Sequence, residues 1–338
     1  MLPKGEARKD RTMINRMLVP LDGTPLAETA LQPAAILAKH FEAEVILLVR
    51  SIATWPPGEP MPSDDLTAMS AAEEYLTTTA SRLTREGLTV YRAVLGEEPA
   101  SGISAEADYH RADLIVMATH GRTGLDALLH PSVTWEVLRQ TNAPILTWKA
   151  KEEPGKAPDP AWVPRFLQDA RAPILVPLDG SLLAEQALPL AQAFAQRLGN
   201  PLLLVRAAEQ PFIAGSAIDY AEVLFRAREW SLTEASSYLE RKRLELAAAH
   251  PPITITSHLG EATTVIRDEV QTHQAGLVVM ASHGRSGLGR FLLGSVARSL
   301  LSQLEVPVLL VRNQPAEAVP AEISETGERS GNSRSVVS

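Results

Sequence analysis

The chain has 338 residues, a formal net charge of −8 at pH 7 and no cysteine. The acidic balance argues against a general nucleic-acid binder, and the lack of cysteine excludes disulfides and thiolate metal sites within this sequence. No apolar run reaches the ~18 residues that predict a membrane span, and the first residues lack the apolar core of a signal peptide. We therefore expect a cytoplasmic protein that binds neither nucleic acid nor membranes. Its length suits two domains of about 150 residues each.

In the first half of the chain, short apolar runs alternate with segments of helical character. Strands are predicted at 17–19, 45–49, 89–94, 114–117 and 144–148, and helices at 25–40, 65–85, 99–109 and 133–141. Thr24 is a suitable N-cap, and Pro25 suits the first helical position. Continuous apolar runs such as 45–49 are typical of strands buried on both faces of a parallel sheet.

The second half repeats the first in the same order. Met17–Leu31 and Ile174–Leu188 are identical at 11 of 15 positions, and Val116–Val133 and Val279–Val296 at 11 of 18. Such long matches indicate duplication of a whole domain rather than a solenoid. The repeat predicts further strands at 174–176, 202–205, 253–257, 277–280 and 308–311, with a long helix near 218–249.

The duplication also sets the expected domain boundaries. We predict a first domain at 13–149, a linker rich in proline and charge at 150–171, and a second domain at 172–313. Residues 1–12 are expected to be a flexible tail, and residues 314–338, with few large apolar side chains, a disordered one.

Alternating strands and helices predict an α/β fold with a parallel sheet and right-handed crossovers. In such a sheet a ligand lies beyond the carboxyl ends of the strands, where the loops after the first and fourth strands meet. In the second half these loops carry Asp179 and two glycine turns, Gly284 and Gly294, and the second turn starts a helix. Backbone N–H groups there suit a phosphate.

Each of these features also has a plainer interpretation. The glycine loop could bind nothing, and Asp179, followed by glycine, could be a turn or cap residue. Arg285 could reach a phosphate or simply be solvated. His283 is expected to order its loop rather than transfer protons.

These motifs resemble the universal stress protein superfamily in its tandem two-domain form, over 13–149 and 171–313. Nucleotide-binding members carry Gly-x-x-Gly, nine residues, then Gly-Ser or Gly-Thr, and this chain has Ala281-x-x-Gly284, nine residues, then Gly294-Ser295. The family's Pro-x-Asp matches Pro177-Leu178-Asp179. The resemblance implies two five-stranded parallel-sheet sandwich domains of adenine nucleotide alpha hydrolase-like, Rossmann-like order 3-2-1-4-5, related by a pseudo-two-fold axis.

The resemblance implies ATP or AMP as ligand. Asp179 would contact the ribose, the backbone at Ala281 the sugar, and the backbone at Arg206 the adenine, while the glycine turns and Ser295 would hold the phosphates. Mg or Mn would bridge the phosphates without dedicated protein ligands. Ala281 replaces the family's first glycine, and its methyl crowds the sugar. The candidate residues are Pro177, Asp179, Arg206, Met280, Ala281, Gly284, Arg285, Gly294, Ser295 and Val296.

The first-half counterparts are degenerate. They are Asp22, Gly121, Pro131 and Ser132. Proline at position 131 has no N–H to offer a phosphate, and losing one charge-assisted donor costs about 1.5–3 kcal/mol, or tenfold or more in affinity. Pro131 also suits the start of a helix. We therefore expect nucleotide to bind mainly in the second half, with low occupancy in the first.

The main functional prediction is an adenine-nucleotide-binding regulatory protein of the stress response, with a protein partner that the sequence does not identify. The alternative is a nucleotide-free structural or interaction module, and a more distant one is a weak ATPase. The sequence has no P-loop, dinucleotide-binding, hydrolase-elbow or His-Glu-x-x-His motif, and we assign no catalytic residue. The resemblance also implies pairing of 144–148 with 308–311, an intrachain pseudo-dimer, and allows a homodimer of such chains.

Overall fold

A computed structural model describes residues 13–50, 63–95, 98–119, 133–150, 157–210, 219–246, 252–282 and 293–312. The ten strands in these ranges form a single sheet in the order β3-β2-β1-β4-β5-β10-β9-β6-β7-β8. The first half contributes β1 (Arg16–Leu21), β2 (Glu44–Arg50), β3 (Val90–Leu95), β4 (Leu114–Thr119) and β5 (Ile145–Lys149). The second half contributes β6 (Ile174–Pro177), β7 (Leu202–Ala208), β8 (Ile253–Leu259), β9 (Leu277–Ala281) and β10 (Val308–Val311). Within each half the strands follow the predicted order 3-2-1-4-5.

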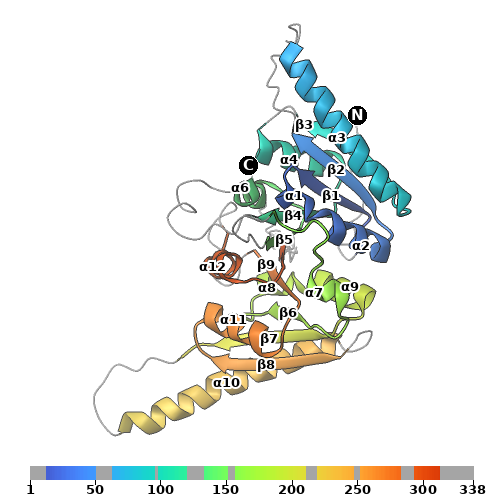
Figure 1. Ribbon diagram of the computed structural model, residues 1–338. Helices are drawn as coiled ribbons and strands as arrows, with labels where there is room; N and C mark the ends of the chain where they lie inside the picture. Colours follow the sequence, from blue (N-terminus) through green and yellow to red (C-terminus); the bar gives the residue numbers. More distant parts are fainter. Residues whose placement is uncertain are drawn as a thin grey trace, which may run out of the picture.

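The two halves join through their last strands, at a pairing that we call the junction. β5 and β10 run antiparallel, with Leu146 opposite Leu309, whereas the other strand pairs are parallel. The intrachain pairing implied by the resemblance is therefore present, and one sheet runs through the whole molecule (Figure 1). Each half covers the edge that the other would otherwise expose.

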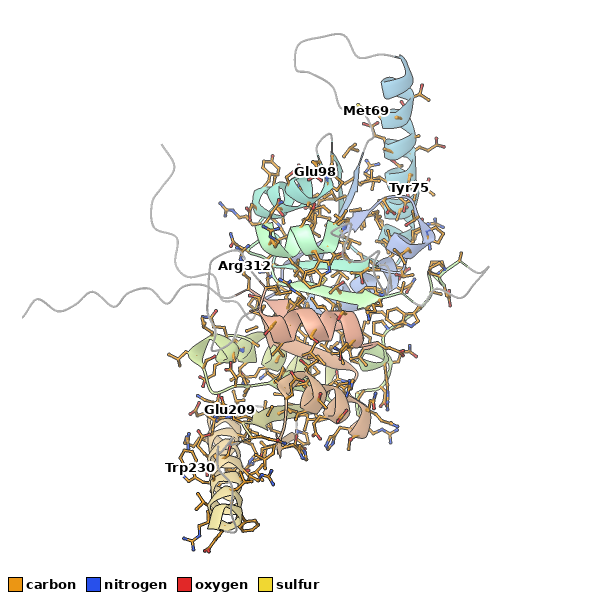
Figure 2. The ribbon with its side chains drawn as sticks, turned by 90° about the vertical axis from the view of Figure 1, so that its left-hand side faces the viewer. Met69, Tyr75, Glu98, Glu209, Trp230 and Arg312 are labelled. Atoms are coloured by element: carbon orange, nitrogen blue, oxygen red, sulfur yellow. The ribbon has the colours of Figure 1, made fainter. Side chains whose placement is uncertain are left out.

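Helices cover both faces of the sheet. They are α1 (Pro25–Glu28), α2 (Leu31–Phe41), α3 (Ser63–Arg85), α4 (Pro99–Tyr109), α6 (Val133–Gln140), α7 (Arg165–Gln168), α8 (Leu182–Glu185), α9 (Leu188–Leu198), α10 (Asp219–Leu246), α11 (Ala262–Thr272) and α12 (Ser295–Gln303). One apolar cluster is continuous across both halves on one face, and separate clusters under α4 and α11 fill the other. The long helices α3 and α10 extend at opposite ends of the molecule (Figure 2). Trp230, on α10, is 72% exposed.

The predicted helix from Pro25 to His40 is wrong in one respect, because the structure has two helices there. The N-cap is confirmed, since the Thr24 Oγ1 accepts a hydrogen bond from the Ala27 N–H at 3.2 Å. α1 ends at Glu28 and α2 begins at Leu31. Pro33 has no N–H to donate to the carbonyl four residues earlier, so a single helix cannot continue through this point. In the second half, Pro189 is the second residue of α9, one position earlier in its helix than Pro33 in α2.

The described part of the predicted linker packs against both halves. Phe166 in α7 is only 1% exposed and its ring centroid lies 6.5 Å from that of Phe194. The Trp162 ring lies 5.4 Å from the Trp148 ring of β5. The composition predicts a spacer, but its aromatic side chains anchor it to the core. The linker and domain boundaries themselves stay predictions.

Two further predictions concern the tails and a membrane span. The tails at 1–12 and 314–338 lie outside the described residues. Among the helices that are described, none is both long and apolar enough to cross a bilayer.

Candidate functional site

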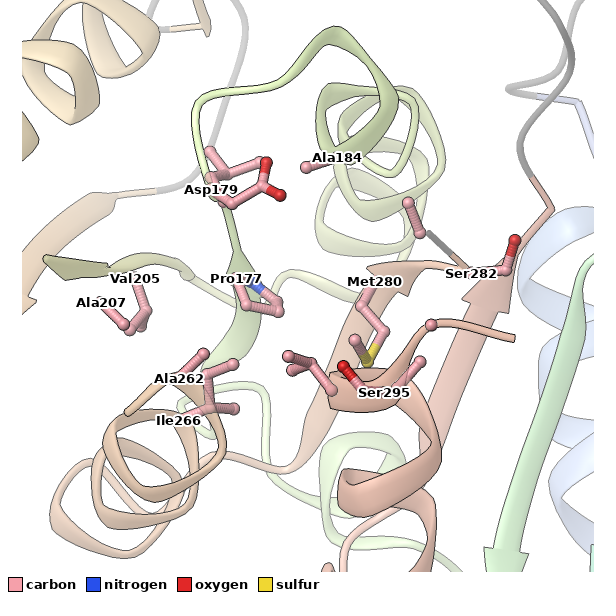
Figure 3. Close-up of a pocket in the computed structure, with 15 residues that line it drawn as sticks. Pro177, Asp179, Ala184, Val205, Ala207, Ala262, Ile266, Met280, Ser282 and Ser295 are labelled. Carbon is pink, nitrogen blue, oxygen red and sulfur yellow. The ribbon is translucent and has the colours of Figure 1, made fainter. Parts of the chain in front are cut away.

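A cavity of about 260 Å³ opens at the carboxyl ends of the second-half strands, and we call it the second-half cavity (Figure 3). Its walls come from the loop after β6, the ends of β7 and β9, and the first turns of α11 and α12. This is where the loops after the first and fourth strands of a parallel sheet are expected to meet. Seven of the ten predicted second-half residues line it: Pro177, Asp179, Met280, Ala281, Gly294, Ser295 and Val296.

The remaining predicted residues are placed differently. Arg206 does not line the cavity, although Val205 and Ala207 on either side of it do. Since side chains alternate along a strand, the Arg206 side chain points to the opposite face of the sheet. Gly284 and Arg285 lie outside the described residues, and so do Gly121, Pro131 and Ser132 of the first half.

Asp179 has the turn role that its sequence context allows. Its Oδ1 accepts hydrogen bonds from the Ser181 N–H at 2.9 Å and the Ser181 hydroxyl at 2.6 Å. Asp22 makes the same two bonds to Thr24, at 2.9 and 2.6 Å. The turn is therefore common to both halves, and in the second half it holds the carboxylate at the cavity wall (Figure 3).

The first turn of α12 forms the polar end of the cavity. The Gly294 N–H donates to the Ser282 carbonyl at 2.9 Å, so this amide is already used within the protein. Gly294 occupies the N-cap position without a side-chain cap. The N–H groups of Ser295, Val296 and Ala297 have no carbonyl within the helix to pair with, and all three residues line the cavity.

The opposite wall of the cavity is apolar. Val205 and Ala207 come from β7, Ala262 and Ile266 from α11, and Met280 from β9. Ala281, which is 6% exposed, also lines the space, so the residue that replaces the family's glycine lies at the site. A planar, weakly polar group suits this wall, and an anion suits the amides of α12.

Sequence reasoning did not identify the α11 residues or the alanines of the wall. Alternation along β7 is the signal that could have found Ala207, two residues beyond Val205. No comparable signal exists for Ile266, because its place depends on how α11 packs on the sheet.

A polar network on the other face of the sheet was also missed. The Arg206 guanidinium, 5% exposed, pairs with Glu234 at 2.8 Å and lies 4.7 Å from the Tyr238 ring centroid. The Tyr238 hydroxyl donates to Glu185 at 2.9 Å, and burial together with this carboxylate raises the pKa of Tyr238. Gly180 has a φ of +87°, and a Cβ there would come 3.2 Å from the guanidinium. The network thus packs directly against the loop that carries Asp179.

The first half repeats part of this network. The Tyr75 hydroxyl donates to Glu28 at 2.9 Å, and burial raises the pKa of Tyr75 in the same way. Tyr75 and Tyr238 belong to the corresponding long helices α3 and α10. The matching tyrosines are the sequence signal that could have predicted the pair.

Comparisons with known proteins agree on one family. The model of the universal stress protein family matches residues 13–149 and 171–312. A universal stress protein of Mycobacterium tuberculosis is 28% identical over 274 residues, covering 77% of this chain and 83% of that protein. Another, from Mycolicibacterium smegmatis, is 24% identical over 306 residues, covering 88% and 96%. The chain therefore belongs to the universal stress protein family, in tandem form.

Solved structures show the same fold. A universal stress protein from Archaeoglobus fulgidus superposes with a TM-score of 0.63 at 18% identity, covering 89% of this chain and 97% of that one. A Pseudomonas aeruginosa protein described as a putative universal stress protein gives a TM-score of 0.61 at 19% identity, covering 90% and 95%. At this identity the likeness concerns the fold alone.

Acidic and histidine side chains do not gather into a metal site in the part of the chain that the structure describes, where no group of three or more is placed to hold an ion. The divalent ion implied by the resemblance would be held by phosphates, so this finding does not test it.

Proposed function

We propose that this protein binds an adenine nucleotide, ATP or AMP, in the second-half cavity and acts as a regulatory protein of the stress response. The observation that supports this most directly is the pairing of an apolar wall with the uncapped first turn of α12 in one cavity. Membership of the universal stress protein family supports the stress-related role. On this proposal the protein works in the cytoplasm and its bound nucleotide sets its conformation or its choice of partner.

The cavity suggests how the parts of the nucleotide would be arranged. The base would lie against Val205, Ala207 and Ile266, near the backbone at Arg206. The ribose would lie between Asp179 and Ala281. Phosphates would accept hydrogen bonds from the first-turn amides of α12, whose positive end attracts an anion. Mg or Mn, if bound, would bridge the phosphates.

The hydrogen bond donated by the Gly294 N–H refines the role predicted for this residue. Because its N–H is bonded to Ser282, Gly294 would contribute space for the phosphate rather than a hydrogen bond. Gly284 and Arg285 would complete the phosphate end from residues outside the described part of the chain.

The same bond supports an asymmetry between the halves. Pro131 corresponds to Gly294 in the sequence repeat and has no N–H. It therefore cannot donate a hydrogen bond equivalent to the one that Gly294 donates in the second half. We therefore infer that the first half binds nucleotide weakly or not at all, with Asp22, Gly121 and Ser132 as remnants of a site.

The test begins with protein purified without added nucleotide. Heat-released material, separated by chromatography, should contain an adenine nucleotide, and calorimetric titration of emptied protein with ATP and AMP should show one site per chain. Two equal sites would overturn the asymmetry. Neither carried-over nucleotide nor measurable heat would leave the alternative, an interaction module that keeps only the scaffold.

A further inference from the structure

Two contacts cross the junction in a reciprocal way. Lys149, the last residue of β5, donates from Nζ to the Ser302 carbonyl in the last turn of α12. Arg312, directly after β10, donates from Nη1 to the Thr141 carbonyl directly after α6. Each half therefore places a cation at the C-terminal end of the helix that follows the glycine loop of the other half.

The two helices differ in how much they need this cation. The C-terminal end of a helix carries partial negative charge and unpaired carbonyls, which a cation stabilises. α6 has its own basic residue in its last turn, Arg139, whereas α12 has none. Lys149 thus supplies from the first half the charge that the sequence of α12 lacks.

Further contacts fasten α12 to the first half. The Arg298 guanidinium of α12 lies 6.0 Å from the Trp135 ring centroid of α6. Leu138 of α6 packs against the apolar cluster of the second half as well as that of the first. The two helices lie close together at the junction (Figure 1).

The opposite end of α12 forms the polar end of the second-half cavity. Nine residues at 1.5 Å per residue make a rigid rod about 14 Å long, so a change at one end moves the other.

Burial lowers the pKa of Lys149, although the nearby Glu305 opposes this shift. A half-buried cation bonded to a backbone carbonyl has few other positions available to it.

We propose that Lys149 is a positioning residue for the second-half cavity. By holding the C-terminal end of α12, it keeps the first-turn amides of Ser295, Val296 and Ala297 at the cavity. The second-half site is then complete only when the first half is joined to it. This proposal rests on the proposed nucleotide binding for its ligand, but its structural part can be tested without nucleotide.

The test uses the full-length protein with three variants. Lys149→Met keeps the aliphatic stem and removes the charge, and Lys149→Arg keeps a cation. Lys39→Met is the matched control, because Lys39 lies in the last turn of α2 and pairs with Glu86 at 2.9 Å. Circular dichroism and thermal melts establish that each variant is folded at the temperature of measurement.

The first measurement is backbone amide exchange in nucleotide-free protein. Lys149→Met should speed exchange in α12 about two- to fivefold, the effect expected for a helix-terminal charge, and leave α9 unchanged. Lys149→Arg should restore the wild-type rate, and Lys39→Met should leave α12 unaffected. Unchanged α12 exchange in Lys149→Met would overturn the proposal.

The second measurement is the dissociation constant for ATP by calorimetry. Lys149→Met should raise it about two- to fivefold, and Lys149→Arg should bring it back. An altered exchange rate with an unaltered dissociation constant would overturn the positioning role. If the wild-type protein binds no ATP, the proposed function fails, and amide exchange still decides whether Lys149 holds α12.

Discussion

The two halves of this protein share a scaffold and differ at the two ends of one helix. Strand order, the aspartate turn after the first strand and the tyrosine–glutamate pair are the same in both. At the start of the helix, Gly294 directly precedes α12, whereas Pro131 lies two residues before α6. At its end, α6 has a basic residue of its own in the last turn and α12 has none. The features that the halves share maintain the fold, whereas those that differ lie at the helix whose first turn is proposed to hold the phosphates. Substitutions at the ends of this helix therefore test the proposed site with the shared scaffold left intact.

The largest expected effect comes from Gly294→Asp. An aspartate at this N-cap would accept hydrogen bonds from the first-turn amides of α12 and place a negative charge where a phosphate is proposed to lie. We expect ATP affinity to fall about 100-fold, since at least one charge-assisted donor and the attraction of the helix end are lost. Calorimetry measures this loss.

The same variant separates binding from folding. The new cap should leave the melting temperature unchanged or raise it slightly, because an aspartate N-cap stabilises a helix by roughly a few tenths of a kcal/mol relative to glycine. Gly294→Ala, which adds a methyl but no cap, is the control and should weaken binding much less. Wild-type affinity in Gly294→Asp would show that phosphates do not lie at α12.

Pro131→Gly tests the comparison from the other side. Restoring an N–H at this position would allow the turn to close as it does at Gly294, and the value of that one hydrogen bond should improve affinity in the first half about tenfold. At high ATP concentration the titration should then show a second, weaker site per chain. If the variant titrates with the same single site as the wild type, Pro131 is not what distinguishes the halves.

The central strands were predictable from sequence because they are buried on both faces and therefore form continuous apolar runs. The edge strands β3 and β8 are only partly buried. Val308–Val311 was predicted with the bounds that the structure has, and most other strands to within two residues. The order of the strands followed from the duplication together with the resemblance. Local patterns were enough wherever burial alone decides the structure.

The rest depends on contacts between segments far apart in the chain. The Tyr238–Glu185 bond joins residues 53 positions apart, and the Lys149–Ser302 contact residues 153 apart. No periodicity within one segment reports such pairs. The break before α2 was missed for a different reason, because Thr24 and Pro25 are strong helix-starting signals and the effect of Pro33 was not weighed against them.

The tyrosine pair gives a smaller effect, which sharpens the comparison within the scaffold. Tyr75→Phe and Tyr238→Phe each remove one hydrogen bond to a carboxylate, at a cost of about 1 kcal/mol in partly buried surroundings. Glu185 keeps Lys242 as a partner at 3.0 Å after its tyrosine is changed. We therefore expect Tyr238→Phe to destabilise less than Tyr75→Phe in urea unfolding. The reverse order would show that Lys242 does not compensate.

The smallest expected effect concerns the caps of α11 and α4. The Glu261 carboxylate accepts hydrogen bonds from the Thr263 and Thr264 N–H groups at 3.0 and 2.9 Å, whereas Glu98 shows no side-chain cap within the described part of α4. Burial raises the pKa of Glu261, but these hydrogen bonds outweigh it and hold the pKa below its ordinary value.

The sign of the pH dependence follows from that lowered pKa. The contribution of Glu261 is fully present above its unfolded pKa, about 4.3, and is lost as the pH falls through the lower folded value. Glu261→Ala should therefore cost about 0.5 kcal/mol at pH 7, allowing for solvent screening of an exposed side chain, and progressively less in acid. Glu98→Ala, the matched change in the first half, should cost nothing measurable at either pH. Equal losses in both variants, measured by urea unfolding from pH 7 to pH 3, would show that the halves do not differ at this cap.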